Sequence, residues 1–252
     1  MLQHTDPARM AREPFDGPQG ANGTVRLQAL QTLEALARPF PQGHVFTHYL
    51  DCDPMVTVLF RGVAARVRNT SDGRRRIVGL LFAGEASGST GLISSRANYE
   101  LCALNDCVAT QLRGPELRRV EARQPAVRSF LVASTQQQLE TLQDMLVDGT
   151  GRRVEERLHA LLQDMYRRLR RTGAAEDGCM EVPLRQIDLA DMLGVSTVQM
   201  SRAFAQLRSR GVHCLRRGAV MQVCFGCEPC DIPIDGDIAF PDRAMLDHGQ
   251  RG

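Results

Sequence analysis

The stretch LRQIDLADMLGVSTVQMSRAFAQL at residues 184–207 decides the fold. Its apolar residues recur at helical spacing on both sides of Gly194, which predicts two short helices joined by a tight turn at that glycine. Ser196 stands where the second helix begins, so its hydroxyl can cap the first free N–H groups. The pattern predicts a helix-turn-helix, a motif that places its second helix in the major groove of DNA.

The second of these helices has a polar face near its N-terminus. Viewed down the helix, Val198 and Arg202 point away from its apolar side. The residues that flank them are Thr197, Gln199 and Ser201. Side chains of this length at a helix N-terminus suit base edges and phosphates. Two short helices with small-residue turns also occur in enzymes, so the spacing alone does not decide the function.

Charge is distributed unevenly along the 252 residues. All 31 basic residues are Arg, whose guanidinium matches phosphate oxygens in a bidentate fork. Residues 150–218 carry 13 Arg against 8 acids, whereas residues 219–252 carry 2 against 6. A local basic excess points weakly to nucleic acid. No run has the apolar length of a membrane span or a signal-peptide core, so the sequence predicts a cytoplasmic protein with no membrane partner.

Short apolar runs punctuated by turn residues fill residues 42–112. The runs are Val56–Phe60, Val63–Val67, Ile77–Phe82 and Tyr99–Thr110. The dipeptide Asp72-Gly73 lies between two of them and is the strongest short hairpin signal in the chain. This pattern predicts a compact antiparallel β barrel or roll. A short helix is expected before it, at about Val25–Ala37.

From Val127 to Val147 the apolar period becomes helical. One set of residues on this helix recurs at alternating intervals of four and three residues. This is the spacing found where two helices pack side by side. The members of this stripe are Leu131, Thr135, Gln138, Leu142 and Met145. With Thr and Gln at its centre, the stripe suits a modest dimer seam, and the alternative is that it packs on the chain's own barrel. Gly149 and Gly151 end the helix, and a second helix runs to about Arg171.

The cysteines suggest a second activity. Cys224, Cys227 and Cys230 have the two-residue spacing that lets thiolates converge on one iron–sulfur cluster or zinc ion. Cys214 or Cys179 could supply a fourth ligand. Unligated tail thiols are the alternative reading of the same spacing. The rival to a DNA-binding function is therefore a redox or metal-binding protein in which this cluster is the main function.

At these motifs the chain resembles the Crp/Fnr superfamily of bacterial transcription regulators. The resemblance rests on Leu193-Gly194-Val195-Ser196 and Ser201-Arg202 in the helix-turn-helix, and on Gly84-Glu85 and Asn105-Asp106-Cys107 in the roll. It implies an α+β fold with an N-terminal antiparallel β roll, a long dimerisation helix and a C-terminal winged helix-turn-helix. It also implies a homodimer that binds a two-fold symmetric site in double-stranded DNA and signals to RNA polymerase. It does not imply an enzyme, and no catalytic arrangement of residues stands out.

The resemblance also assigns roles to residues. Thr197, Val198 and Arg202 take the base-reading positions, and Arg202 can fork onto guanine O6 and N7. Val198 stands where an acidic residue is common, so a thymine methyl is its natural partner. The wing is expected to turn at 216–218. The full set of expected DNA contacts is Arg185, Gln186, Ser196, Thr197, Val198, Gln199, Ser201, Arg202, Arg216 and Arg217.

The family's cyclic-nucleotide pattern fails in this chain. Gly88-Ser89-Thr90-Gly91 lacks the ribose-binding Glu, and Ala97-Asn98 stands where an Arg and a small hydroxyl residue would hold the phosphate. Cyclic AMP is therefore not expected as the effector. The domain boundaries that follow are 1–23 for a mobile arm, 24–122 for the roll, 123–149 for the dimerisation helix, 150–223 for the winged helix-turn-helix and 224–252 for the acidic tail with its cysteines.

Overall fold

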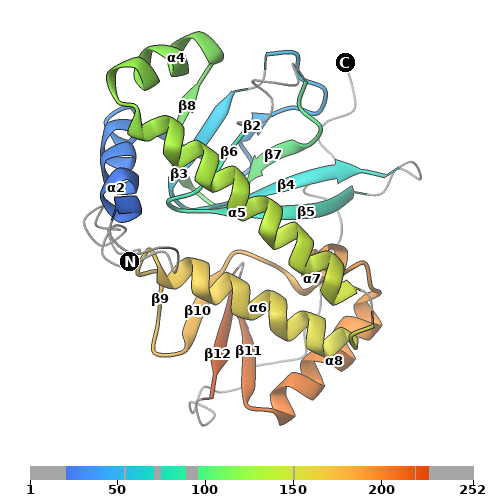
Figure 1. The fold of residues 1–252 in the computed structure, drawn as a ribbon. Coiled ribbons are helices and arrows are strands. Elements are labelled where there is room, and N and C mark those ends of the chain that lie inside the picture. Colours follow the sequence, from blue (N-terminus) through green and yellow to red (C-terminus); the bar gives the residue numbers. More distant parts are fainter. Residues whose placement is uncertain are drawn as a thin grey trace.

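The N-terminal half of the chain is a roll of two four-stranded antiparallel sheets (Figure 1). The computed structural model describes residues 21–53, 55–70, 75–88, 96–149, 151–218 and 220–226. One sheet has the strand order β1-β8-β3-β6 and the other β2-β7-β4-β5. The strands are β1 (Arg38–Phe40), β2 (Val45–Thr47), β3 (Val56–Arg61), β4 (Val63–Asn69), β5 (Arg75–Phe82), β6 (Ala86–Ser87), β7 (Glu100–Ala103) and β8 (Cys107–Leu112). The predicted roll is confirmed.

Both sheets of the roll are covered on both faces, which explains why their strands read as continuous apolar runs instead of alternating ones. Between the sheets lies a core that contains Leu59, Leu81 and Leu101. The outer face of the β3 sheet packs against helices, and its core includes Val58. The outer face of the β4 sheet packs against the C-terminal domain, through residues that include Phe82.

In the described part of the chain, four helices connect and cover the roll. They are α2 (Ala21–Glu34), α4 (Gly114–Arg123), α5 (Ala126–Gly149) and α6 (Val154–Arg170). Pro115 lies in the first turn of α4, where its missing N–H costs nothing. In the view of Figure 1, α5 crosses the front of the roll and α6 returns beneath it. The expected long helix is confirmed, and it begins and ends within two residues of the predicted bounds.

The C-terminal domain is a winged helix-turn-helix. It contains α7 (Gln186–Leu193) and α8 (Thr197–Ser209), and a sheet with the order β11-β12-β10-β9. The strands are β9 (Ala175–Glu176), β10 (Cys179–Val182), β11 (Val212–Arg217) and β12 (Val220–Phe225). Pairs such as Arg217 with Val220 close the wing hairpin. The expected α+β fold is therefore confirmed, with the β roll, the long helix and the winged helix-turn-helix following one another in that order.

One detail of the roll differs from the sequence prediction. The run Tyr99–Thr110 is two strands, β7 and β8, because Asn105 and Asp106 form a turn between them. The Asn105 side chain accepts a hydrogen bond from the Val63 N–H at 2.7 Å, which fixes that turn against β4. The Asp72-Gly73 turn lies outside the described residues, but β4 and β5 pair antiparallel up to Asn69 and Arg75, as a hairpin requires.

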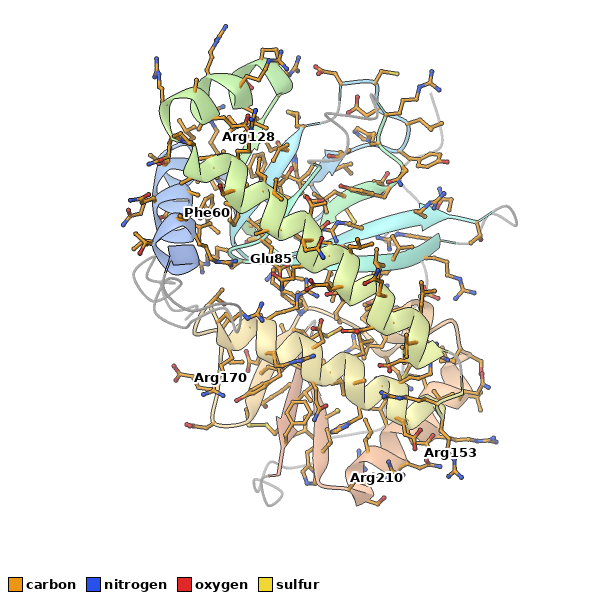
Figure 2. All side chains as sticks on the ribbon, viewed as in Figure 1. Phe60, Glu85, Arg128, Arg153, Arg170 and Arg210 are labelled. Carbon is orange, nitrogen blue, oxygen red and sulfur yellow. A yellow bond between two sulfur atoms is a disulfide. The ribbon has the colours of Figure 1, made fainter. Side chains whose placement is uncertain are left out.

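The roll and the C-terminal domain are joined by a buried ion pair. Arg168 of α6 donates two hydrogen bonds to the Glu85 carboxylate, at 2.8 Å and 2.7 Å. Its guanidinium also lies over the Phe82 ring, 4.5 Å from the centroid. Glu85 sits at the junction of the two halves in Figure 2. Within the described residues, no helix is long and apolar enough to cross a membrane.

Candidate nucleic-acid interface

The turn between α7 and α8 follows from two local residues. Gly194 ends α7 in the left-handed conformation, with φ of 67°, which side chains other than glycine rarely adopt. Ser196 begins α8 as its N-cap, where its Oγ accepts from the Gln199 N–H at 3.2 Å. The Gln199 side chain accepts in return from the Ser196 N–H at 3.0 Å. This reciprocal capping box fixes the direction in which α8 leaves the turn.

The first two turns of α8 present an exposed face. Met200 and Ala203 are buried against the domain core, whereas Val198 is 60% exposed on the opposite side. Thr197 and Arg202 are exposed on the same face. Arg202 makes no hydrogen bond or ion pair with any residue that the structure describes. The base-reading positions expected from sequence are therefore together on one open face of α8.

Other predicted contact residues are engaged within the protein. The Gln186 side chain on α7 donates to the Ser201 hydroxyl on α8 at 2.7 Å, so these two hold the helices together. The Arg185 guanidinium is bound to the Asp188 carboxylate, with nitrogen–oxygen distances of 3.1 Å and 3.0 Å. This pair raises the pKa of Arg185 through the hydrogen bond to Asp188. The side-chain oxygen of Gln199 is likewise occupied by the cap. Gln186, Arg185 and Gln199 therefore have fewer free polar groups for DNA.

The wing follows α8 as the strands β11 and β12. Arg216 is exposed, and its Nε donates to the Gly218 carbonyl oxygen at 2.8 Å across the turn. Gly218 has φ of 61°. The Arg217 side chain lies outside the described part of the chain. The tip of the wing therefore carries at least one cation beside the exposed face of α8.

The part of the chain that forms this interface is also similar in sequence to known proteins. Residues 156–223 match the family described as a Crp-like helix-turn-helix domain. The chain is 24% identical over 190 residues to the transcriptional activator protein FnrL of Cereibacter sphaeroides, covering 73% of this chain and 76% of that protein. It is 26% identical over 163 residues to the nitrogen fixation regulation protein FixK of Bradyrhizobium diazoefficiens, covering 64% and 67%.

Residues 156–223 therefore carry a Crp-like helix-turn-helix domain, and the chain as a whole is similar to transcription regulators. The solved structure of FixK2 from Bradyrhizobium japonicum has the same fold, with a TM-score of 0.62 at 21% identity, covering 75% of this chain and 91% of that one. The regulator CLP of Xanthomonas campestris also shares the fold, with a TM-score of 0.61 at 16% identity over 79% and 99% of the two chains. The curated relatives are regulators of transcription and not enzymes.

Two of the predicted metal ligands, Cys214 and Cys224, are not brought together. Cys224 pairs with Cys179 across β12 and β10 and forms a disulfide with it. Cys214 pairs with Val223, the neighbour of Cys224 on β12, so the side chains of Cys214 and Cys224 point to opposite faces of the sheet. Cys227 and Cys230 lie outside the described residues. The expectation of Cys214 and Cys224 as joint ligands is therefore wrong.

Cys214 is a free thiol on β11. Burial raises the pKa of this thiol to about 12, so it is protonated in the fold described here. Among the described residues no group of three or more His, Cys, Asp or Glu side chains is placed to hold a metal ion.

The predicted dimer seam on α5 is also partly corrected. Leu131 is only 4% exposed and packs into the core between α5, α2 and β3 of its own chain. Gln138 donates to the Ala86 carbonyl oxygen of the same chain. Leu131 therefore cannot present a surface to a partner, and the alternative of packing on the chain's own roll holds for this part of the stripe.

A different stripe of α5 is left uncovered. Val132 is 64% exposed, Leu139 49% and Leu146 72%. These residues are seven apart, the repeat of two helices packed along each other. Leu142 is 46% exposed between them. The heptad spacing was present in the sequence, but the position of the roll decides which stripe is covered.

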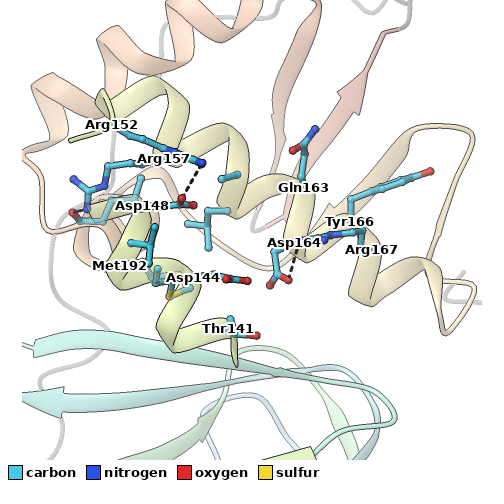
Figure 3. A pocket seen from close by; sticks show the side chains of 15 residues that line it. Thr141, Asp144, Asp148, Arg152, Arg157, Gln163, Asp164, Tyr166, Arg167 and Met192 are labelled. Carbon is cyan, nitrogen blue, oxygen red and sulfur yellow. Dashed lines mark hydrogen bonds and ion pairs between the residues drawn. The ribbon is translucent and has the colours of Figure 1, made fainter. Parts of the chain in front are cut away.

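Two hollows lie along α5. The larger, of about 600 Å³, is in the bend between α5 and α6 (Figure 3). Most of its charged groups are paired within the chain: Arg152 with Asp148 at 2.7 Å, and Arg167 with Asp164 at 3.6 Å. Arg157 donates to the Leu193 carbonyl oxygen. The second hollow, of about 390 Å³, lies between α5 and the roll, where Arg66 and Arg168 form part of its wall.

Proposed function

We propose that the protein binds double-stranded DNA by placing α8 in the major groove. The observation that carries this proposal is the exposed face of α8, where Arg202 has no partner among the described residues while its helix is fixed by the Ser196 cap. A guanidinium free at this position can fork onto guanine O6 and N7, and Val198 can contact a thymine methyl. Arg216 on the wing is then a phosphate contact.

The proposal includes a homodimer, because a two-fold symmetric site needs two α8 helices. The uncovered α5 stripe of Val132, Leu139 and Leu146 supports a second copy of the chain as the occupant. A parallel pair of α5 helices would bury these side chains and leave both α8 helices free. Since the curated relative FnrL is named a transcriptional activator, the proposal extends to a contact with RNA polymerase.

The DNA part of the proposal is tested by selection from a random DNA library with the full-length protein. A two-fold symmetric motif is expected. Arg202→Ala should weaken binding to that motif by about 1–3 kcal/mol and relax the preference at one base position in each half-site. Arg210→Ala, at the residue that follows the C-terminal end of the same helix, is the matched control and should keep the preference. Recovery of no symmetric motif would contradict the proposal.

The dimer is tested separately on a sizing column. The double variant Leu139→Asp with Leu146→Asp should elute as a monomer with an intact circular dichroism spectrum. Ala133→Asp is the control, because Ala133 is exposed on the same helix but lies outside the stripe. If the double variant remains a dimer, the seam is elsewhere. In vitro transcription from a promoter with the selected motif tests the contact with RNA polymerase.

A further inference from the structure

A disulfide and an imidazole lie in one row on the outer face of the wing sheet, the sheet β11-β12-β10-β9. Cys224 of β12 is directly opposite Cys179 of β10, to which it is bonded. On its other side, Cys224 is directly opposite His213 of β11. Opposite residues of antiparallel strands share a face, with Cβ atoms about 4.5–5.5 Å apart. This face points away from the domain core, because the adjacent residues Met180 and Val223 are buried in that core.

The two cysteines of this row differ in accessibility. Cys224 is only 6% exposed, whereas Cys179 is half-buried. Thiol–disulfide exchange begins when a thiolate attacks one sulfur of the disulfide, and its rate depends on access to that sulfur and on how easily the other one leaves. An incoming thiolate therefore reaches Cys179 first, and Cys224 is the leaving group. The imidazole of His213 lies beside this leaving sulfur, where its protonated form stabilises a departing thiolate.

The disulfide also joins the two ends of the DNA-binding unit. Cys179 precedes α7 and Cys224 follows the turn of the wing, so the segment between them contains α7, α8 and the wing turn. Backbone pairing of β10 with β12 holds the same two strands together as far as Val182 and Met221. Loss of the disulfide should therefore loosen the wing without unfolding the domain. A protein that is already ordered before binding loses less freedom when it binds, so the linked form should have the higher affinity for DNA.

A disulfide is unusual in a protein that binds DNA, because the compartments that hold DNA keep thiols reduced. Disulfides in such proteins are usually transient and either catalytic or redox-sensing. We propose that Cys179 and Cys224 form a thiol–disulfide exchange site for a dithiol reductant, and that the linked form binds DNA more tightly than the reduced form. The inference rests on the proposed function in its choice of compartment and in its effect on DNA, whereas the exchange itself is measured without DNA.

The exchange takes place in two steps. A thiolate of the dithiol attacks Sγ of Cys179, which breaks the protein disulfide and forms a mixed disulfide with the reductant. Cys224 leaves as a thiolate and takes up a proton, for which the His213 imidazolium is the neighbouring donor. The second thiolate of the reductant then attacks the reductant's own sulfur in the mixed disulfide and releases Cys179. Two electrons, and two protons by way of the solvent, have passed from the dithiol to the protein, and the reductant is left as a disulfide.

The exchange is tested on the full-length protein in buffers with set ratios of reduced to oxidised dithiothreitol. Acid stops the exchange, free thiols are alkylated with N-ethylmaleimide in urea, and peptide mass spectrometry identifies them. Cys179 and Cys224 should become alkylated together in one two-electron transition, whereas Cys52, a free and exposed thiol, should be alkylated at every ratio. Alkylation of the pair at every ratio, or only after the protein has unfolded, would overturn the proposal.

Two further measurements test the roles of the individual residues. With glutathione as a monothiol, the trapped intermediate should carry glutathione on Cys179 and N-ethylmaleimide on Cys224, and the reverse arrangement would contradict the order of attack. His213→Gln should slow reduction at least threefold and leave the midpoint ratio of dithiothreitol unchanged, because a group that assists both directions does not alter the equilibrium. A shifted midpoint with an unchanged rate would contradict this role. His159→Gln is the control, since His159 contacts Phe225 on the core side of the sheet.

The effect on DNA is measured with the selected motif on the linked and the reduced protein. The reduced form should bind at least threefold more weakly, with an unchanged circular dichroism spectrum. Cys179→Ser with Cys224→Ser should bind like the reduced parent and should not respond to dithiothreitol, whereas Cys52→Ser should keep the response. Equal affinities of the two forms, or a response in the double variant, would overturn the proposal. If neither form binds any motif, the proposed function fails, and the alkylation result separately decides whether the exchange site exists.

Discussion

Two helices, α6 at the junction with the roll and α8 in the helix-turn-helix, use arginine in opposite ways. At the junction with the roll, Arg168 is buried and its guanidinium is held by Glu85 and Asp164, at 2.7 Å and 3.2 Å. On the exposed face of α8, Arg202 has no partner among the described residues. The residue type is the same, so the difference comes from the surroundings. A buried cation needs partners from its own chain, whereas an exposed one keeps its donors for another molecule.

The largest effect is expected at the junction. Glu85→Gln removes the carboxylate that neutralises Arg168 and should lower the free energy of unfolding by about 3 kcal/mol, the lower end of the range for breaking a buried pair, because Asp164 remains beside the guanidinium. Urea denaturation measures this change. Arg128→Gln, which removes the exposed end of the pair with Glu121, should change it by less than about 1 kcal/mol. Equal effects would remove the contrast between buried and exposed arginines.

The same pair predicts a pH dependence. Burial alone would raise the pKa of Glu85, but the Arg168 guanidinium and its hydrogen bonds outweigh burial and hold that pKa below the ordinary value of 4.5. A carboxyl with a depressed pKa stabilises the folded state above its unfolded pKa, and this contribution is lost as the pH falls below it. Stability measured from pH 7 to pH 3 should therefore fall more steeply in the parent than in Glu85→Gln.

The wing sheet should show an effect of similar size. The Cys179–Cys224 disulfide joins residues 45 apart in sequence, and a link of this kind commonly stabilises a fold by about 2–4 kcal/mol. The double variant Cys179→Ser with Cys224→Ser should lose that amount in thermal or urea unfolding. Dithiothreitol should have the same effect on the parent and none on the variant. Cys52→Ser, at an exposed thiol, serves as the control.

The smallest effect is expected at the start of α8. Ser196→Ala removes the N-cap acceptor and should cost about 1 kcal/mol of stability. Because the cap also directs α8, affinity for the selected DNA motif should fall as well. Ser209→Ala at the other end of α8 is the control for a serine that does not cap the N-terminus. A loss of stability without any loss of affinity would show that the cap does not position the face that carries Arg202.

The sequence was most informative where the rules are local. The left-handed turn at Gly194, the cap at Ser196 and the proline at the start of α4 each depend on a few neighbouring residues, so the helices could be predicted closely. The short strands β1, β2, β6, β9 and β10 were not predicted. Each is two to four residues long, too short for a hydrophobic period to be recognised.

The same distinction between local and long-range determinants applies to the candidate sites. The exposed positions of α8 could be predicted, because helix geometry alone sets which residues share a face. Leu131 could not be assigned, since only the packed roll decides which stripe of α5 is covered. The opposite orientation of Cys214 and Cys224 depends on the register of β11 against β12. Nothing in the sequence marked the pairing of Glu85 with Arg168, which are brought together from distant parts of the chain.

The shared core between the roll and the C-terminal domain has a consequence for how the protein unfolds. One apolar cluster contains Leu80 and Phe82 of β5 together with Leu162 and Leu189 of α6 and α7. The glycines at the end of α5 mark a boundary in the sequence, but they do not separate two independent cores. Melting in a calorimeter should therefore give one cooperative transition. A fragment beginning at α6 would expose the apolar surface that β5 covers in the full chain, so it should aggregate.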